Sequence, residues 1–240
     1  MVKIEPVWNE KALMVDSNLI IADLHIGFER ELEKKGVNLP SQTETMIGTV
    51  LKLLRKKPVK RLIINGDLKH NIPKGSWQEY KEIPKAIDSW LKEVDEIHLI
   101  HGNHDGGIER YLPSDVEIHD SSGTTFKSVG YLHGHAYPSD EVLSSETIVL
   151  GHCHPTVVFI DALDQREKKQ CWIRIQYQVN NHEGSAIILP HYNPLLGGIS
   201  INEEGYLGPF LRMIYKKSEK VYLLDGSFLG ELKDVNQSLK

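Results

Sequence analysis

Cysteine, long apolar runs, an export signal and a strong charge excess are all scarce or missing in this sequence. Its 240 residues include only Cys153 and Cys171, which cannot build a disulfide framework and are expected to be reduced thiols. No stretch approaches the roughly 20 uninterrupted apolar residues of a membrane span. The start, MVKIEPVWNEKALMV, lacks the basic and apolar regions of a signal peptide. We therefore expect a cytoplasmic protein with no membrane partner.

The net charge of −5 gives no bulk attraction to nucleic acid, although a local basic patch stays open. With 40% hydrophobic and 25% charged residues, the composition excludes a disordered or fibrous chain. The one excess is histidine, with 12 residues. Because histidine is the commonest metal ligand and a frequent acid–base group, the positions of these residues matter most.

The first part of the chain predicts strands that alternate with helices. Strands are expected at residues 12–15, 18–22, 61–65 and 96–101, and helices at 28–35, from about 41 to 57, and at 79–94. Ser41 and Glu44 have the spacing of a capping box for the second helix, which should end before Pro58. Pro84 is expected to interrupt the third helix.

Beyond about residue 115 the pattern changes to strand after strand. The expected strands are 116–119, 124–127, 130–132, 147–150, 156–160, 171–179, 186–189, 198–201 and the hairpin 221–224/228–232. The hydrophilic segment 161–169 is interpreted as a solvated loop. No repeat or long linker divides the chain, so we expect one domain over residues 1–240 with a layered α/β arrangement.

Five polar clusters each follow a predicted strand. In chain order they are Asp23-Leu24-His25, Gly66-Asp67-Leu68-Lys69-His70, Gly102-Asn103-His104-Asp105, His133-Gly134-His135 and Gly151-His152-Cys153-His154. Residues at such positions converge along one edge of a sheet, and the glycines let the turns approach a ligand closely. Side chains two apart in a strand share a face, so Asp23 with His25, and His152 with His154, are each expected to hold a shared centre. Cys153 should then point away and pack.

The residue types indicate divalent metal ions. Asp, His and Asn, with no obligatory thiolate, suit Mn²⁺, Fe²⁺ or Zn²⁺. The ligands outnumber those of one tetrahedral site, which suggests two ions sharing a bridging carboxylate; such a pair activates a water and binds phosphoryl oxygens. Chance turns, a single structural zinc site and a non-catalytic metal-binding scaffold are the alternatives. Five clusters in this order favour the enzyme.

The pattern D-x-H, G-D-x-x-H, G-N-H-D, H and G-H-x-H over residues 23–154 resembles the calcineurin-like metallophosphoesterase superfamily. The segments ADLHIGFERELEKKGVNLP, NGDLKH and LPHYNPLLGGISIN are similar to the SbcD-related archaeal phosphoesterases and the bacterial ligase-associated ones. The resemblance implies an α/β (α+β) fold, a four-layer α/β/β/α sandwich of two facing mixed β-sheets flanked by helices. It also implies two divalent metal ions, with Mn²⁺ expected and Fe²⁺, Zn²⁺ or Ni²⁺ as alternatives.

The resemblance also assigns metal ligands. One ion is expected on Asp23, His25 and His154, and the other on Asn103, His133 and His152, with Asp67 bridging both.

Other roles follow from the same resemblance. His104 is expected to act as the general acid toward the leaving oxygen or to stabilise the transition state, with Asp105 orienting its ring. His135 is assigned to the substrate or to a position behind the ligands, and His70 to a contact that is either structural or with the substrate. The remaining histidines are interpreted as packed or surface residues: His98, His101, His119, His182 and His191.

Together these features predict a binuclear metal-dependent phosphoesterase in which a metal-bridging hydroxide attacks phosphorus. The SbcD resemblance favours phosphodiester bonds, in a nucleotide, DNA or RNA. The acidic balance and the lack of a basic-aromatic segment do not support extended nucleic-acid binding, so a compact phosphodiesterase acting on small or single-stranded substrates is expected. A phosphomonoesterase or protein phosphatase is the alternative, and the oligomeric state stays open, with a dimer as one option.

Overall fold

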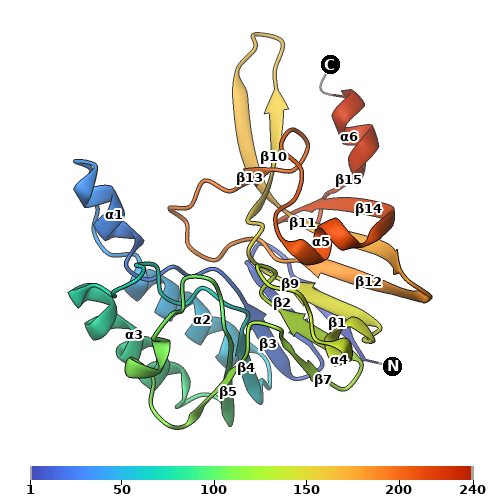
Figure 1. Cartoon of the computed structure of the whole chain (residues 1–240). Helices are drawn as coiled ribbons and strands as arrows, with labels where there is room; N and C mark the ends of the chain where they lie inside the picture. The colour runs from blue at the N-terminus through green and yellow to red at the C-terminus, as the bar shows by residue number, and fades with distance from the viewer. Residues whose placement is uncertain (1, 239–240) are drawn as a thin grey trace.

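The computed structural model describes residues 2–238 and contains two mixed β-sheets that pack face to face (Figure 1). The first sheet has six strands in chain order: β1 (Ile4–Val7), β2 (Ala12–Val15), β3 (Asn18–Ile21), β4 (Arg61–Ile64), β5 (Glu96–Ile100) and β6 (Val116–His119). Strands β1 to β3 are antiparallel, whereas β3 to β6 are parallel. The polar segments after β3, β4 and β5 therefore leave the sheet at the same edge.

The second sheet has nine strands in the order β13-β10-β11-β12-β9-β8-β7, with β14 beside β11 and β15 beside β14. Their bounds are β7 (Thr124–Phe126), β8 (Val129–Leu132), β9 (Thr147–Leu150), β10 (Pro155–Ile160), β11 (Arg166–Val179), β12 (His182–Ile188), β13 (Ile199–Ser200), β14 (Tyr215–Leu223) and β15 (Phe228–Glu231). Strands β8 and β9 are parallel to each other. The segments that follow them thus leave this sheet at one edge as well.

Apolar side chains on both faces of both sheets create three core layers. Between the sheets, Ile20 and Ile63 of the first sheet meet Tyr131 and Val149 of the second. On the outer face of the first sheet lie α2 (Thr43–Lys56) and α3 (Trp77–Trp90). On the outer face of the second lie α4 (Asp140–Leu143), α5 (Pro209–Met213) and α6 (Leu232–Ser238). This confirms the expected four-layer α/β/β/α sandwich.

Two expectations about the helices are wrong in detail. Helix α2 starts after Gln42, not Ser41: the Ser41 oxygen accepts the N–H of Thr43 at 3.2 Å, not that of Glu44, and its hydroxyl donates to Glu82 of α3 at 2.9 Å. The complete capping box is at α3, between Ser76 and Glu79. Helix α3 also continues through Pro84. The fully buried face that this helix presents to the sheet outweighs the one backbone hydrogen bond that proline removes.

The interpretation of residues 161–169 as a loop is also wrong for its second half. Strands β10 and β11 pair as far as Ile160 opposite Arg166, so only residues 161–165 form the turn. The charged residues that follow form a hairpin arm that projects from the sheet in Figure 1. An exposed pair of strands needs no apolar face, so the hydrophilic composition of this segment gave no indication of a strand. Within residues 2–238, no helix is long and apolar enough to cross a bilayer.

Candidate metal centre

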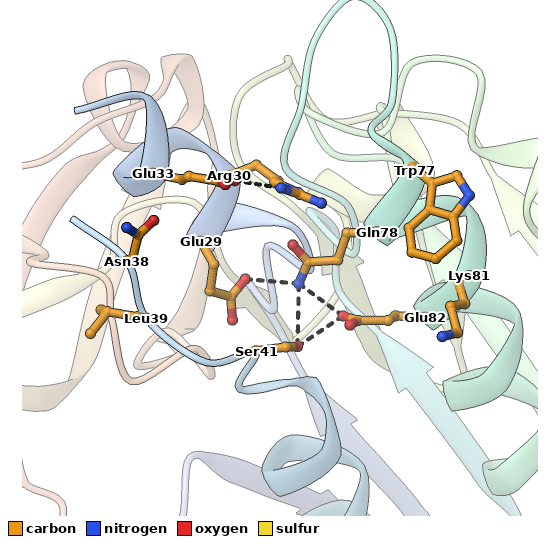
Figure 2. A pocket seen from close by; sticks show the side chains of 10 residues that line it. All are labelled: Glu29, Arg30, Glu33, Asn38, Leu39, Ser41, Trp77, Gln78, Lys81 and Glu82. Carbon is orange, nitrogen blue, oxygen red and sulfur yellow. Dashed lines mark hydrogen bonds and ion pairs between the residues drawn. The ribbon is translucent and has the colours of Figure 1, made fainter. Parts of the chain in front are cut away.

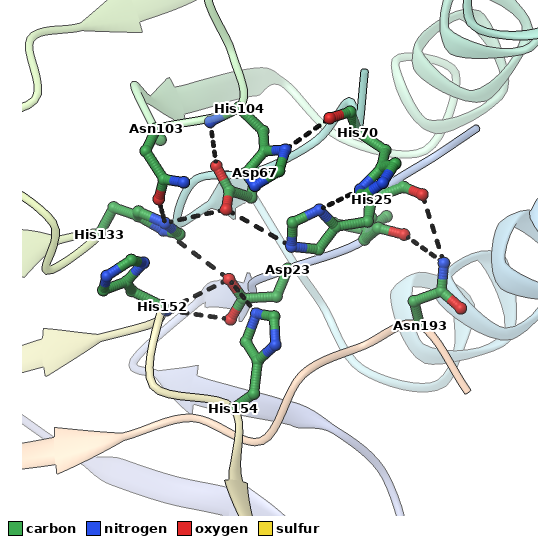
Figure 3. A network of polar contacts seen from close by, with 12 residues as sticks. Asp23, His25, Asp67, His70, Asn103, His104, His133, His152, His154 and Asn193 are labelled. Atoms are coloured by element: carbon green, nitrogen blue, oxygen red, sulfur yellow. Dashed lines mark hydrogen bonds and ion pairs between the residues drawn. The ribbon is translucent and has the colours of Figure 1, made fainter. Parts of the chain in front are cut away.

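All five polar clusters meet at the edge where the parallel strands of the two sheets end (Figure 3). Asp23 and His25 follow β3, Asp67 follows β4 and Asn103 follows β5. The second sheet adds three histidines, His133 after β8, and His152 and His154 after β9. Convergence at carboxyl ends of parallel strands is the arrangement expected from the sequence.

Five of these residues adopt the left-handed backbone conformation. The φ angles are 59° for Asp23, 43° for His25, 53° for Asp67, 64° for His152 and 43° for His154. Such conformations cost on the order of 1 kcal/mol or more each and are typical of functional sites. These left-handed residues end the alternation of side chains between the two faces of each strand. As a result, His152 and His154 lie in two neighbouring groups and do not share one centre, contrary to the expectation from strand spacing.

The first group contains Asp23, His25 and His154, whose ligand atoms all lie within 4.8 Å of one another. His154 Nε2 is 3.1 Å from Asp23 Oδ1, but the pair lacks the alignment of a hydrogen bond. His25 Nε2 is buried and also has no hydrogen-bond partner. Two ring nitrogens turned toward a buried carboxylate without donating to it are suited to bind a common cation.

The second group contains Asp67, His133 and His152, again with ligand atoms within 4.8 Å. His133 Nδ1 donates to the carbonyl oxygen of Asn65 at 2.9 Å. In the neutral ring this leaves the lone pair on Nε2, which faces Asp67 Oδ2 at 3.2 Å and Asn103 Oδ1 at 3.3 Å. A backbone acceptor that fixes the tautomer in this way is usual behind a metal-binding histidine.

Asp67 lies between the two groups. Its Oδ2 is 3.4 Å from His25 Nε2 in the first group and 3.2 Å from His133 Nε2 in the second. Its Oδ1 accepts the backbone N–H of His104 at 2.8 Å. One oxygen of the carboxylate is therefore fixed by the loop backbone, and the other faces both groups of ligands. This is the geometry required of a bridging ligand.

The electrostatics at this point favour a cation. Burial lowers the pKa of the His133 ring, but the carboxylates of Asp67 and Asp23 outweigh it and raise that pKa to about 10. Burial raises the pKa of the Asp67 carboxyl, yet His133 and His25 lower it further than burial raises it. Two buried carboxylates thus require positive charge here, which a divalent ion supplies more strongly than a proton.

Two of the other histidines are kept neutral. Burial lowers the pKa of His25 to about 3, even though the Asp67 carboxylate opposes this shift. Burial, together with the nearby His133, lowers the pKa of His152 to about 4. Their nitrogens therefore carry lone pairs at neutral pH, as metal ligands must.

His70 lies behind His25, where its ring is buried. Its Nε2 is 2.7 Å from Glu31 Oε2 of helix α1 (Phe28–Lys34), and its Nδ1 is 3.1 Å from His25 Nδ1. Of the two contacts expected from the sequence, the structural one is therefore present. The backbone of His70 is held too, because Glu79 Oε1 accepts its N–H at 2.9 Å.

His104 is half-buried beside the first group, with its ring 4.7 Å from that of His25 between centroids. Its Nδ1 donates to the carbonyl oxygen of His70. The sequence analysis expects Asp105 to orient this ring, but the structure gives that carboxylate other partners. Asp105 accepts the backbone N–H groups of Asp67, Lys69 and Gly102 at 2.8, 3.2 and 2.9 Å. It therefore shapes the loop backbones, and His70 orients the His104 ring.

His135 is half-buried beside the second group, with its ring centroid 5.4 Å from that of His133 and 6.1 Å from that of His152. Burial, with the nearby His133, lowers its pKa to about 4. This neutral ring at the margin of the cluster is compatible with both roles expected from the sequence, at the substrate or behind the ligands.

Glycine is required at two positions where a ligand side chain lies directly against the backbone. A Cβ on Gly66 would lie 2.2 Å from His133 Nδ1, and a Cβ on Gly102 would lie 2.2 Å from Asp67 Oδ1. His133 of the second sheet thus packs directly on the backbone after β4, and Asp67 packs on the backbone after the neighbouring strand β5. Cys153 points away from the cluster, as expected, and its thiol donates to the carbonyl oxygen of Leu207 at 3.2 Å.

Sequence reasoning missed several supporting residues. Asn193 donates from its side-chain amide to the carbonyl oxygens of Leu24 and His25, at 2.9 and 3.3 Å. His191, interpreted as an ordinary residue, is buried with its ring centroid 5.2 Å from that of His154. Both residues lie in the segment LPHYNPLLGGISIN. The sequence analysis uses this segment only for the family resemblance and assigns no role to its residues.

A separate cavity of about 280 Å³ lies between α1 and α3 (Figure 2). Gln78 spans it, donating to Glu29 at 3.2 Å and to Glu82 at 2.9 Å. None of the predicted site residues lines this cavity. Its polar network joins the two helices that also supply Glu31 and Glu79 to His70, so we interpret it as part of the support of the centre.

The residues present fit divalent metal ions. The donor set is made of oxygen and imidazole nitrogen, two carboxylates need positive charge, and the buried nitrogens of His25 and His154 have no hydrogen-bond partner. All seven predicted ligands lie at this cluster: Asp23, His25, Asp67, Asn103, His133, His152 and His154.

Comparisons with known proteins identify a matching family and a similar fold. The family model described as calcineurin-like phosphoesterase matches residues 19–212. The crystal structure of nuclease MPE from Pseudomonas putida is similar, with a TM-score of 0.58, 17% sequence identity, and coverage of 96% of this chain and 100% of that one. YfcE, a phosphoesterase from E. coli, has a TM-score of 0.45 and 15% identity over 89% of this chain and 97% of its own. A search of curated protein sequences finds no match.

Proposed function

Because the chain belongs to the calcineurin-like phosphoesterase family, we propose that it cleaves phosphodiester bonds at a centre of two divalent metal ions. Family membership makes the protein a hydrolase of phosphoric ester bonds. The observation that carries the binuclear centre is the position of Asp67 Oδ2, 3.4 Å from His25 Nε2 and 3.2 Å from His133 Nε2. One carboxylate oxygen thereby touches both groups of ligands.

In this proposal Asp23, His25 and His154 hold one ion, and Asn103, His133 and His152 hold the other. Asp67 holds both. When bound, such ions lower the pKa of a coordinated water and offset the charge of the phosphoryl oxygens. The chain's own contribution is to fix the ligand tautomers, through the carbonyl oxygen of Asn65 behind His133 and the ring of His70 behind His25.

The substrate approaches the side of the cluster that solvent reaches. Asn103 is exposed and His104, His135 and His152 are half-buried, whereas Asp23 and Asp67 are buried. His104 donates from Nδ1 to a backbone oxygen, so its Nε2 is the atom that hands a proton to the leaving oxygen when the ring is protonated. His135 contacts the substrate from the other side of the cluster.

Two arguments favour a diester over a monoester. The four residues on the open side offer amide and imidazole groups and no guanidinium, the group that best binds a dianionic phosphate by two parallel hydrogen bonds. Nuclease MPE, whose name implies diester cleavage, shares the fold over 96% of this chain. The SbcD-related phosphoesterases, which the sequence resembles, stay the proposed subgroup.

We further propose Mn²⁺ as the resident ion, with Fe²⁺, Zn²⁺ and Ni²⁺ as competitors. Oxygen and imidazole ligands suit all four, and the thiol of Cys153, which would favour a softer ion, is turned toward Leu207. A cytoplasmic location, expected from the sequence, belongs to the same proposal.

The test is hydrolysis of a chromogenic bis-aryl phosphodiester and of the matching monoester by metal-stripped protein reloaded with Mn²⁺. We expect Mn²⁺-dependent cleavage of the diester in preference to the monoester. Asp67→Asn should reduce the rate by more than about 100-fold and reduce metal content, because losing even a residue behind a ligand costs 10- to 100-fold in affinity. Preference for the monoester would identify a phosphatase instead. Two bound ions without turnover of either ester would contradict the diesterase.

A further inference from the structure

A second cluster of metal-binding side chains lies on the first sheet and shares no residue with the centre described above. It consists of His98 on β5, and Glu117 and His119 on β6. The two strands are parallel and pair His98 with Glu117 and Ile100 with His119. Since residues two apart on a strand share a face, all three side chains emerge on the same side of the sheet.

The donor atoms of these side chains converge. His98 Nδ1 is 2.9 Å from His119 Nε2 and 3.5 Å from Glu117 Oε2. His119 Nε2 is 3.6 Å from Glu117 Oε1. Two imidazole nitrogens and one carboxylate oxygen form a common donor set for Zn²⁺, with water in the remaining position.

His98 is held as metal-binding histidines usually are. Its Nε2 lies 3.1 Å from Glu96 Oε2, and Arg61 Nε donates to the same carboxylate oxygen at 2.5 Å. A carboxylate only accepts, so His98 donates from Nε2 and presents the lone pair of Nδ1 to Glu117 and His119. A carboxylate behind the ring fixes its tautomer and strengthens it as a ligand.

The surroundings restrict the rings further. His98 is only 3% exposed, and its ring stacks on that of His119 at 5.2 Å between centroids. Phe126 packs edge-on against both rings, and the Arg61 guanidinium lies over Phe126 at 4.6 Å. The two imidazole rings are therefore fixed by packing, and the exposed side chain of Glu117 completes the set of donors.

We propose that His98, Glu117 and His119 bind one Zn²⁺ ion, a third metal site of the chain. The ion connects the edge strand β6 to β5, directly before the loop that carries Asn103. That loop is already attached to β6, because His101 donates its N–H to the carbonyl oxygen of His119 at 3.0 Å. Zn²⁺ at this cluster therefore braces one side of the catalytic loop from His98, two residues before the end of β5.

The experiment measures Zn²⁺ bound per chain, by elemental analysis after metal-stripped full-length protein is equilibrated with Zn²⁺ and freed of excess. Wild type should bind one ion more than His119→Ala. His182→Ala, which removes a half-buried histidine outside both clusters, should bind as many as wild type. Asp67→Asn should lose ions at the principal centre and keep this one, so the two proposals fail separately.

Glu117→Gln provides a second variant that cannot unfold the sheet, because this side chain is 65% exposed. In the Asp67→Asn background it should raise the dissociation constant for Zn²⁺ by at least about tenfold. Equal stoichiometry and affinity in wild type, His119→Ala and Glu117→Gln would overturn the proposal. The cluster would then be a hydrogen-bonded histidine pair in which His119 donates to His98.

Discussion

The Nδ1 atoms of His25 and His70 lie 3.1 Å apart, so one ring must donate to the other. Glu31 decides which ring donates. Its carboxylate can only accept, so His70 donates to it from Nε2, 2.7 Å away, and a neutral His70 then accepts at Nδ1. Burial lowers the pKa of His70, which keeps the ring neutral at pH 7. His25 therefore donates from Nδ1 and turns the lone pair of Nε2 toward Asp67.

This relationship predicts that His70 acts on metal affinity. His70→Ala should weaken binding of the ion at His25 by about 10- to 100-fold, because the ligand loses the group that fixes its tautomer. Excess Mn²⁺ should restore most of the turnover number. Titration of metal-stripped protein with Mn²⁺, followed by activity at saturating metal, measures both effects.

His135→Ala is the matched control, since it removes a histidine beside the other group of ligands. It should raise KM with little change in metal affinity. If instead His70→Ala raised KM and left metal affinity unchanged, His70 would be a substrate contact and the tautomer argument would be wrong.

The role of His104 predicts dependence on the leaving group. His104→Ala should keep two ions per chain and lower the rate by about 10²- to 10⁴-fold for esters of aliphatic alcohols, which need a proton to depart. Esters of acidic phenols depart without that proton and should be affected much less. Rates for a series of esters with leaving groups of increasing pKa test this. A uniform loss across the series would show that His104 stabilises charge and donates no proton.

Gly66 and Gly36 form a matched pair for the close approach of the ligands. Both have positive φ, 89° and 85°, but a Cβ on Gly36 meets nothing within 4 Å, whereas on Gly66 it lies 2.2 Å from His133 Nδ1. Gly36→Ala should cost about 1–2 kcal/mol of unfolding free energy. Gly66→Ala should cost roughly 1–3 kcal/mol more and reduce metal content as His133 is displaced. Denaturant unfolding of metal-stripped protein gives the comparison, and equal costs would contradict the packing of His133 on this backbone.

Much of the centre could be predicted from sequence because each ligand follows an apolar strand. Local patterns report strand ends well, and the parallel order of β3, β4 and β5 brings those ends together. The left-handed turns at His152 and His154 could not be predicted this way, since strand alternation stops where the strand does. The same reason explains why strand spacing alone predicts one shared centre for these two histidines, whereas the family resemblance assigns them to different ions.

The supporting contacts were harder to predict because they join distant parts of the chain. Asn193 is 168 residues from His25, whose carbonyl oxygen it binds. Ser41 has the correct spacing for a capping box, yet its oxygen accepts the N–H of Thr43 and its hydroxyl donates to Glu82 of α3, 41 residues away. A periodic pattern carries no information about such pairs, whereas the presence of helices α2 and α3, which depends on local period, was predicted correctly.

The two thiols should be inert in the folded protein. Burial raises the pKa of Cys153 to about 12 and that of Cys171 well above its usual value. Because the thiolate is the reactive form, raising the pKa lowers reactivity at any pH below it, and at pH 8.5 the thiolate fraction of Cys153 should fall by roughly three orders of magnitude. Mass spectrometry after iodoacetamide treatment should show no adduct on native protein and two after denaturation. Rapid modification of Cys153 in the native state would mean that its thiol can turn toward His152 and His154, and a softer ion than Mn²⁺ would then be the better candidate.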